Sequence, residues 1–386
     1  MPISFCRKGG RKLELLFVLN VHFIFNAQDL NKTGKEITMH SKRIGLIVLI
    51  AVGVALLIGI PKWKIAAQEK ASKIAQGTSK VTLPVSVNNI KPNELGGIMI
   101  LEYHLIGEPE AEWRRAPENF RKDLQMLYDQ GYYPVPLEDL VSGNLKVPAG
   151  KTPFVITFDD SSQGQFRFLK QGNQLLVDPN CALGIMESLK KQHPDFPLTA
   201  TFYVLPEIPH GLRLFGQEEF MKQKLEYLAA HGYEIGNHTY WHQNLGKTDD
   251  IGVQKQIALC VKEVQSYVPG YRVHSLALPL GVHAKNRILE QDGSYQGFQY
   301  HNDSILLVGS GPAISPFSRA FDPYKLERIQ AGDTAWGPKS YVSYYAKNPS
   351  QKFISDGDPT TVSVPKNLAD KVRNISRNKY KIKIVE

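Results

Sequence analysis

Two short motifs carry side chains that together could bind a metal ion and accept a proton. Thr-Phe-Asp-Asp at residues 157–160 ends an apolar run, and His-Thr-Tyr-Trp-His at residues 238–242 ends a second strand-like run later in the chain. Successive strand side chains point in opposite directions, so Asp159 and Asp160 can serve different purposes, one binding an ion and the other taking a proton. Two imidazoles and one carboxylate leave coordination positions open for water and substrate, which is the pattern of a catalytic metal site.

Each motif alone has a simpler explanation. Paired Asp residues at a strand end often form a turn or a helix N-cap, and His-x-x-x-His is often two unrelated surface histidines. Both motifs occur here in one chain in which strand-like and helix-like segments alternate. That combination favours the metal site.

Taken together, residues 96–333 resemble the polysaccharide deacetylases of the NodB-homology type, carbohydrate esterase family 4. The resemblance implies that Asp159 is the catalytic base. It assigns a divalent metal ion, with zinc expected, to Asp160, His238 and His242.

The family's third motif is matched by residues 276–281, with one departure. The segment has no Arg to orient the base carboxylate, as in a subset of the family that carries Ala-Tyr-Pro-Tyr-Gly. The resemblance gives the backbone N–H near Leu280 the role of binding the tetrahedral oxyanion, which needs only the backbone. The family's final Leu-x-His, which supplies a general acid, has no convincing match. His301 and His283 are candidates by position only, and surface histidines are the simpler interpretation of both.

The elements that must position these residues alternate between strands and helices. Pro117 begins a helix with apolar residues at three-to-four spacing, and Gly131 ends it. Further helices are predicted at residues 221–230 and 254–267, and strands at residues 97–104, 200–204 and 233–238. This alternation predicts an α/β fold of parallel strands joined by crossover helices, with the catalytic residues at the carboxyl ends of the strands. The family resemblance narrows the fold to a distorted (β/α) barrel of about seven strands.

The tyrosine–histidine pair that ends the strand at residues 97–104 leaves two alternatives. His104 is either a packed, hydrogen-bonded residue at the mouth of the barrel or a contact to the substrate.

The first part of the chain predicts a membrane anchor. Residues 44–60 are apolar and uncharged, which suits one transmembrane helix or the core of a signal sequence. The leader, residues 1–43, includes residues 1–38, which we expect to be either an over-extended start before Met39 or a cytoplasmic extension. Lys42 and Arg43 favour a cytoplasmic N-terminus, so the enzyme is expected in the cell membrane, as a single-pass protein with its catalytic domain outside. Residues 61–95 are expected to be a polar linker.

The catalytic domain is expected at residues 96–345 and a basic extension at residues 346–386. The chain has 46 Lys and Arg against 37 Asp and Glu, and part of its net charge of +9 lies in this extension. No nucleic-acid partner is predicted, because no aromatic interleaving or nucleic-acid motif accompanies the charge and the expected compartment is wrong. A solvated strand or tail is the default, with attraction to anionic wall polymers or lipid headgroups as a second possibility. With three cysteines a disulfide scaffold is excluded, and Cys181 and Cys260 are either buried and reduced or paired.

The function predicted from these observations is a zinc-dependent deacetylase acting on an extracellular N-acetylated polysaccharide, whether peptidoglycan, a chitin-like polymer or poly-N-acetylglucosamine. The alternative is a catalytically impaired domain that binds polysaccharide at the cell wall, supported by the missing Arg and the unassigned acid. A related hydrolase of a non-sugar C–N bond shares the same metal chemistry. Acetate release from these polymers would separate the three.

Overall fold

The computed structural model describes residues 91–207, 214–309 and 311–386, all within the compact unit Trp63–Glu386. The predicted leader, the anchor at residues 44–60 and nearly all of the predicted linker lie outside these residues. Within the described part of the chain, no helix combines the length and the apolar character needed to cross a bilayer.

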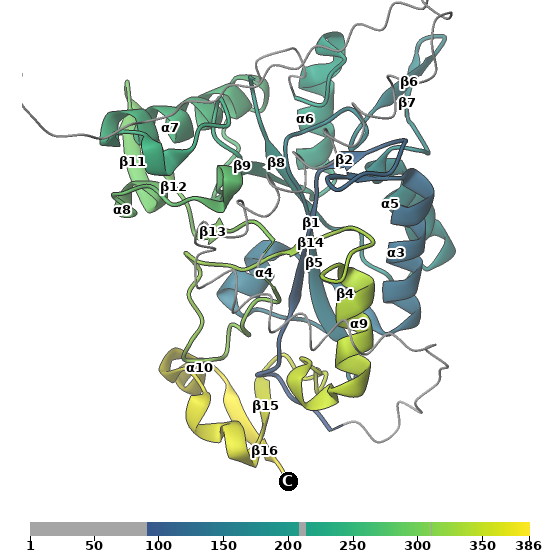
Figure 1. Cartoon of the computed structure of the whole chain (residues 1–386), viewed down its shortest axis with the longest axis vertical. Coiled ribbons are helices and arrows are strands. Elements are labelled where there is room, and N and C mark those ends of the chain that lie inside the picture. Colours follow the sequence, from purple (N-terminus) through teal and green to yellow (C-terminus); the bar gives the residue numbers. More distant parts are fainter. Residues whose placement is uncertain (1–90, 208–213, 310) are drawn as a thin grey trace, which may run out of the picture. The chain divides into compact units, whose positions relative to one another are not determined.

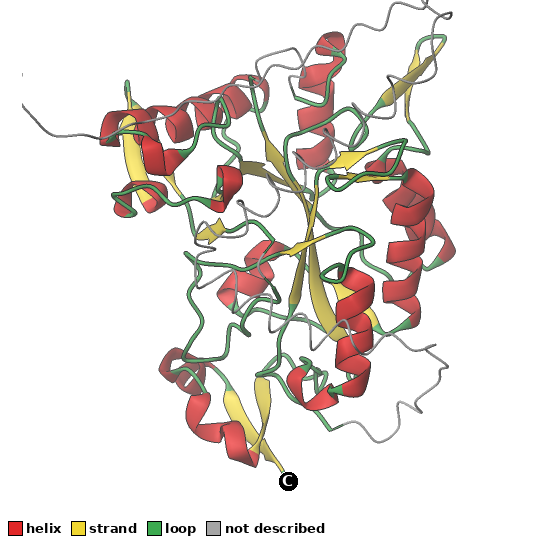
Figure 2. Ribbon diagram, viewed as in Figure 1, coloured by secondary structure: helices red, strands yellow, loops and turns green. Residues whose placement is uncertain are grey.

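Eight parallel strands form a curled sheet at the centre of this unit, with helices around it (Figures 1 and 2). The strand order is β13-β10-β9-β8-β5-β1-β14. Strand β5 has two partners on one of its edges: β4 pairs with its first residues and β8 with its last two. The bounds are β1 Met99–Tyr103, β4 Tyr132–Pro134, β5 Thr152–Phe158, β8 Thr201–Val204, β9 Glu234–Asn237, β10 Ser275–Ala277, β13 Ser304–Leu306 and β14 Ile329–Gln330.

The two ends of the curled sheet approach one another. Leu306, the last residue of β13, forms an isolated parallel bridge with Leu326, three residues before β14 begins. The predicted α/β class and its parallel strands are confirmed, while hydrogen bonding defines eight strands where about seven were expected. Every residue of β1 and β5 is buried, which explains why both are apolar without alternation, as expected of parallel strands covered on both faces.

The predicted helices form where the apolar spacing placed them. The helices are α3 Pro117–Asp129, α4 Leu137–Ser142, α5 Ala182–Gln192, α6 Met221–Ala230, α7 Asp250–Tyr267, α8 Ile288–Gln291, α9 Pro338–Lys347 and α10 Asn374–Lys379. In α3 the predicted apolar residues are buried. Helix α7 begins one turn before the predicted residue 254, because the Asp249 carboxylate accepts a hydrogen bond from Gly252 N–H and caps the helix there.

Short elements complete the described chain. Four two-stranded sheets pair β2 with β3, β6 with β7, β11 with β12, and β15 with β16. Their bounds are β2 Leu105–Ile106, β3 Arg114–Arg115, β6 Phe168–Gln171, β7 Gln174–Val177, β11 Asp292–Tyr295, β12 Phe298–His301, β15 Thr361–Pro365 and β16 Lys381–Val385. The 3-10 helices are η2 Glu218–Phe220, η3 Leu245–Lys247, η4 Pro279–Gly281, η5 Pro349–Gln351 and η6 Lys366–Lys371.

The basic extension is folded into the same unit. Val362 and Val364 of β15 are fully buried in a second hydrophobic cluster that also contains Ile98 and Ile100. Strand β16 is largely exposed, so the extension has a buried strand and a solvated one. Asn93, in the predicted linker, is buried and pairs with Ile354.

Candidate active site

The two sequence motifs meet at the carboxyl ends of two strands of the central sheet. Asp159 and Asp160 follow β5, and His238 follows β9, with β8 between them in the sheet. Several residues in these loops have left-handed backbone conformations, including Asp160 at φ 71° and His242 at φ 52°. Non-glycine residues adopt this conformation at an energetic cost that surrounding contacts must offset, and such residues cluster at functional sites.

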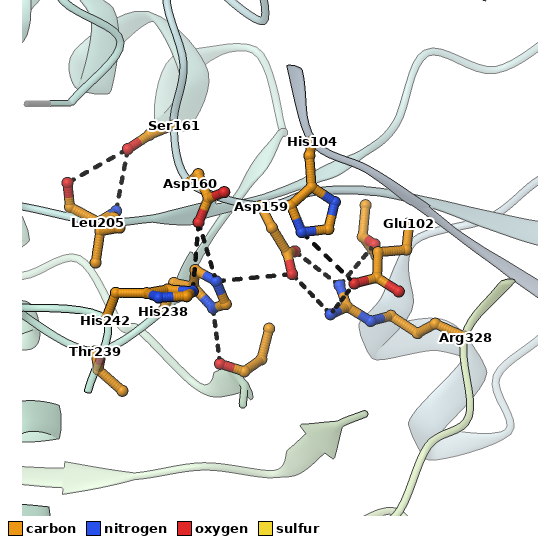
Figure 3. Close-up of polar contacts among 12 residues, drawn as sticks. Glu102, His104, Asp159, Asp160, Ser161, Leu205, His238, Thr239, His242 and Arg328 are labelled. Atoms are coloured by element: carbon orange, nitrogen blue, oxygen red, sulfur yellow. Dashed lines mark hydrogen bonds and ion pairs between the residues drawn. The ribbon is translucent and has the colours of Figure 1, made fainter. Parts of the chain in front are cut away.

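Asp160, His238 and His242 converge on one point (Figure 3). Asp160 Oδ1 lies 3.3 Å from His238 Nε2 and 3.7 Å from His242 Nε2. One donor atom from each residue falls within 4.8 Å of the others. Asp160 Oδ1 and His238 Nε2 are buried and make no hydrogen bond to any described residue. Buried polar atoms normally have a partner, so a cation bound by all three side chains fits this geometry.

The orientation of His238 supports the same interpretation. Its Nδ1 lies 2.9 Å from the carbonyl oxygen of Ala277; a carbonyl only accepts, so Nδ1 donates and Nε2 carries the lone pair that faces Asp160. A ligand imidazole commonly donates its other N–H to a carbonyl in this way. Burial lowers the pKa of His238, but the charges of Asp159 and Asp160 outweigh it and raise that pKa. A divalent ion would replace the proton that these carboxylates favour.

Helix α7 holds the loop that joins the two histidines. Asn237 donates to the carbonyl of Ile257, and Gln256 accepts a hydrogen bond of 2.9 Å from Trp241 N–H. Asn237 also accepts from Thr239 N–H, which stabilises the left-handed turn there. Burial, followed by the charge of His238, lowers the pKa of His242, which favours the neutral imidazole that a metal requires.

Arg328 fixes the second carboxylate of the motif. Its two terminal nitrogens donate to Asp159 Oδ1 and Oδ2, each at 2.7 Å, and its Nε donates to the carbonyl of Leu307 at 2.6 Å. Arg328 and Asp159 are both fully buried. The bidentate pair holds Asp159 in one orientation, with Oδ2 3.8 Å from His238 Nε2.

A second carboxylate shares the same guanidinium. Arg328 donates to Glu102 Oε1 at 3.1 Å, and Gly309 N–H donates to Glu102 Oε2 at 2.8 Å. Burial would raise the pKa of Asp159, but the charges of Arg328 and His238 outweigh it and hold that pKa below its usual range. In contrast, burial raises the pKa of Glu102, since Arg328 only partly opposes it. Asp159 is therefore held in the ionised form that a proton acceptor requires.

Sequence reasoning missed Arg328 and Glu102. It expected an orienting Arg in residues 276–281 and concluded that none was present, whereas the guanidinium comes from a residue adjoining β14. Glu102 is a charged residue inside the apolar strand β1, which was the available signal. Arg328 precedes a strand of two residues, too short for any pattern to reveal it.

His104 lies at the edge of this cluster. Its Nε2 is 3.8 Å from Glu102 Oε1, and one of its ring nitrogens lies within 4.8 Å of a carboxylate oxygen of Asp159. Its ring packs edge-on against Trp113, which is 39% exposed, with the centroids 4.7 Å apart. His104 Nδ1 is buried without a hydrogen bond to any described residue. His104 is therefore an imidazole beside the base with one ring nitrogen that no described residue satisfies.

The remaining predicted residues occupy different places. Leu280 follows β10 by three residues, is 60% exposed and has a left-handed φ of 60°; its role as oxyanion donor stays a prediction. His301 contacts Asp292 and Asp303 through its two ring nitrogens. Asp303 directly precedes β13, at the amino end of the strands, so His301 is far from the carboxyl ends that carry the site. His283 is bound to Glu290 through Nδ1.

The two described cysteines, Cys181 and Cys260, are both buried and unpaired. Of the alternatives that the sequence left open, the structure has the buried, free thiols. Burial raises the pKa of the Cys260 thiol to about 12, so it carries no nucleophilic thiolate at neutral pH.

The site lies within a segment that matches a known family. Residues 146–300 match the family model described as polysaccharide deacetylase, which confirms the resemblance predicted from the motifs. One similar solved structure is the Streptococcus pyogenes deacetylase PplD in complex with acetate, with 19% identity and a TM-score of 0.47 over 65% of this chain and 98% of that chain. A polysaccharide deacetylase from Bacillus cereus has 18% identity and a TM-score of 0.47 over 64% of this chain and 68% of that chain. IcaB from Ammonifex degensii has 18% identity and a TM-score of 0.44 over 64% of this chain and 97% of that chain. No curated protein matches.

Proposed function

We propose that the chain, whose residues 146–300 match the polysaccharide deacetylase family model, is a metal-dependent hydrolase that removes N-acetyl groups from an extracellular polysaccharide. The observation that carries the proposal is the convergence of Asp160, His238 and His242, two of which present a buried atom without a hydrogen-bond partner among the described residues. The Asp159 carboxylate, held by Arg328, lies directly beside them. Three ligands and an adjacent base are what the hydrolysis of an amide by an activated water requires.

Asp160, His238 and His242 would hold the divalent ion, for which zinc suits the two imidazoles and one carboxylate. When bound, the ion supplies Lewis acidity that polarises the acetyl carbonyl and lowers the pKa of a water. The side chain of Asp160 is 27% exposed and that of His242 is 32% exposed, which leaves this edge of the cluster open to a substrate.

Asp159 accepts the proton of the attacking water at Oδ2, the oxygen nearer to His238. Arg328 keeps this carboxylate ionised and prevents it from rotating. Once Asp159 is protonated, Arg328 still faces the Glu102 carboxyl group, so the buried guanidinium keeps a second acceptor throughout the cycle. A charge left wholly unpaired in such a site would be costly.

Leu280 offers its backbone N–H to the oxyanion of the tetrahedral intermediate. Ala277, three residues before it, already contacts His238 through its carbonyl, so the segment that carries Leu280 begins at the metal cluster. The exposed side chain of Leu280 leaves the backbone as its only catalytic contribution. His104 is the imidazole that we assign to proton donation to the leaving amine, in place of His301 and His283.

Arg328 weakens the case for the alternative function. A catalytically impaired polysaccharide-binding domain was supported chiefly by the absence of an Arg to orient the base. A guanidinium now contacts both oxygens of Asp159.

The test is acetate release by the full-length protein from peptidoglycan, chitin oligomers and poly-N-acetylglucosamine. We expect release from at least one polymer, loss of release after chelation and its return with zinc or cobalt. The double variant His238→Ala, His242→Ala is the matched control and should stay inactive when metal is restored. Polymer binding without acetate release in the metal-loaded wild type would favour the binding domain instead.

A further inference from the structure

A buried lysine that the proposed mechanism does not use contacts a turn that is hydrogen-bonded to the catalytic motif. Lys224, on α6, is fully buried, and its Nζ donates to the carbonyl oxygens of Phe215 and Gly216 at 2.9 and 3.0 Å. It forms no ion pair with any described residue; Glu219 and the Cys181 thiol are the acidic groups near it, and Arg167 is the nearby cation. Burying an ammonium group without a negatively charged partner is costly, so the position of Lys224 needs an explanation.

The carbonyls belong to an unusual turn. Leu214, Phe215, Gly216 and Gln217 have four consecutive positive φ angles, of 39°, 69°, 57° and 54°. Left-handed conformations occur routinely only as single residues, and for residues other than glycine each one costs energy. Lys224 attracts two carbonyl oxygens to one cation and so offsets part of that cost.

The turn is bonded directly to the catalytic motif. Phe215 N–H donates to the carbonyl of Ser161 at 2.6 Å. The Ser161 hydroxyl accepts from Leu205 N–H at 3.0 Å on the other side. Asp160, the preceding residue, and Ser161 are themselves left-handed, at φ 71° and 46°. The direction of the Asp160 carboxylate therefore depends on a backbone that the turn at residues 214–217 holds in place.

We propose that Lys224 is a positioning residue for the metal site, acting through the turn at residues 214–217 and the Phe215–Ser161 hydrogen bond to aim the Asp160 carboxylate at His238 and His242. The side chain of Phe215 is also fully buried and packs against Phe202 and Phe166. The Phe215 ring anchors the turn in the hydrophobic core, while the Lys224 ammonium group orients the two carbonyl groups of the turn. Burial lowers the pKa of Lys224 to about 8, which leaves it mostly protonated at neutral pH.

The inference rests on the proposed metal-dependent function, and cobalt binding tests it without measuring activity. In Lys224→Met, which keeps the length and removes the donors, we expect roughly tenfold weaker Co²⁺ binding, the order seen when an outer contact of a metal ligand is lost. The visible spectrum of bound Co²⁺ should also change, because Asp160 approaches the ion differently. Both are measured well below the unfolding temperature of the apo protein.

Two controls on α6 separate positioning from stability. Lys222→Met removes an exposed ion pair with Glu226 and should leave Co²⁺ affinity unchanged. Leu228→Ala empties a fully buried position in the same helix; it should lower the unfolding temperature while leaving the cobalt spectrum as in wild type. If Leu228→Ala weakens Co²⁺ binding as much as Lys224→Met does, Lys224 acts only through stability and the proposal is wrong.

Lys224→Gln serves if Lys224→Met does not fold, since its amide keeps an N–H donor on a shorter chain and should give an intermediate loss of affinity. Wild-type Co²⁺ affinity and spectrum in the folded Lys224 variant would overturn this inference alone. Failure of the wild type to bind Co²⁺ would overturn the proposed function, and the inference with it.

Discussion

At the scale of single residues, Asp159 and Asp160 are neighbours whose surroundings are opposite. Asp159 is fully buried and receives two hydrogen bonds from Arg328, while Asp160 has an orphaned oxygen facing two imidazoles. We expect Asp159→Asn to keep its metal content and lose turnover by about 10²- to 10⁴-fold, the contribution of a general base. Asp160→Asn should lose metal as well. Metal analysis and acetate release measure the two effects; equal loss of metal in both variants would contradict these roles.

The contact between Arg328 and Asp159 predicts how stability and activity depend on pH. The pKa of Asp159 is lower in the folded protein than in the unfolded chain. The Asp159–Arg328 pair therefore stabilises the fold at any pH above the pKa of Asp159 in the unfolded chain. This stabilisation is lost as the pH falls through the pKa of Asp159 in the folded protein. Arg328→Met leaves Asp159 and Glu102 buried together without a cation. We expect the acid limb of the kcat/KM profile to move to higher pH, and stability to fall by about 3–5 kcal/mol.

Arg272→Met is the matched control for that experiment. Arg272 pairs with Asp303 at 2.6 Å, but its side chain is 62% exposed. Exposed ion pairs contribute little, so its removal should leave the pH profile unchanged. An unshifted acid limb in Arg328→Met would show that Arg328 does not set the ionisation of the base.

At the scale of elements, Glu94 joins the first described segment to β15. Its side chain accepts from Ser363 N–H at 2.7 Å, and burial raises its pKa to about 7, with the charge of Asp356 adding to the effect. A carboxyl group with a raised folded pKa favours folding at low pH, and that contribution is lost as the pH rises from about 4.5 to about 7.

Glu94→Gln keeps an acceptor for Ser363 N–H and removes the titration. We expect the variant to match the wild type near pH 5 and to exceed its stability by up to about 3 kcal/mol near pH 8, from a shift of about 2.5 pKa units. Urea unfolding at the two pH values measures the difference. A stability difference that does not change with pH would contradict the raised pKa.

The elements also show what the sequence predicts and what it cannot. Helices α3 and α6 were predicted with their starting residues, because a long helix repeats its apolar spacing and glycine follows its end. Strands β4, β13 and β14 were not predicted, since two or three residues cannot display a period. Their pairing depends on residues distant in the chain, which a local pattern does not contain.

The candidate site divides in the same way. The proposed metal ligands and the proposed base occupy two contiguous motifs, so it could be predicted that these four side chains lie together, as they do in the structure. Arg328 gave no local signal of its burial, and the left-handed conformations of Asp160 and His242 arise from contacts with other loops. The meeting of the two motifs could therefore be predicted from the sequence, while the charges and backbone contacts that orient their side chains required the structure.

At the scale of the whole molecule, the open prediction concerns location. Residues 44–60 form a charge-free apolar run, and we expect them to retain the full-length protein in the membrane fraction with the catalytic domain outside. Protease added to intact cells should then digest the domain. A full-length protein that is digested only after lysis would reverse the topology and remove the extracellular polymer from the proposal.

The cluster of Arg328, Asp159 and Glu102 can form only late in synthesis of the chain, because its cation is made last. Arg328 is 169 residues from Asp159 and 226 residues from Glu102. At ribosomal rates of 5–20 residues per second, Arg328 is made roughly 10–30 s after Asp159. Until then Glu102 and Asp159 lack the cation that lets them share a dry interior. The base therefore cannot be oriented by this guanidinium before synthesis has passed Arg328.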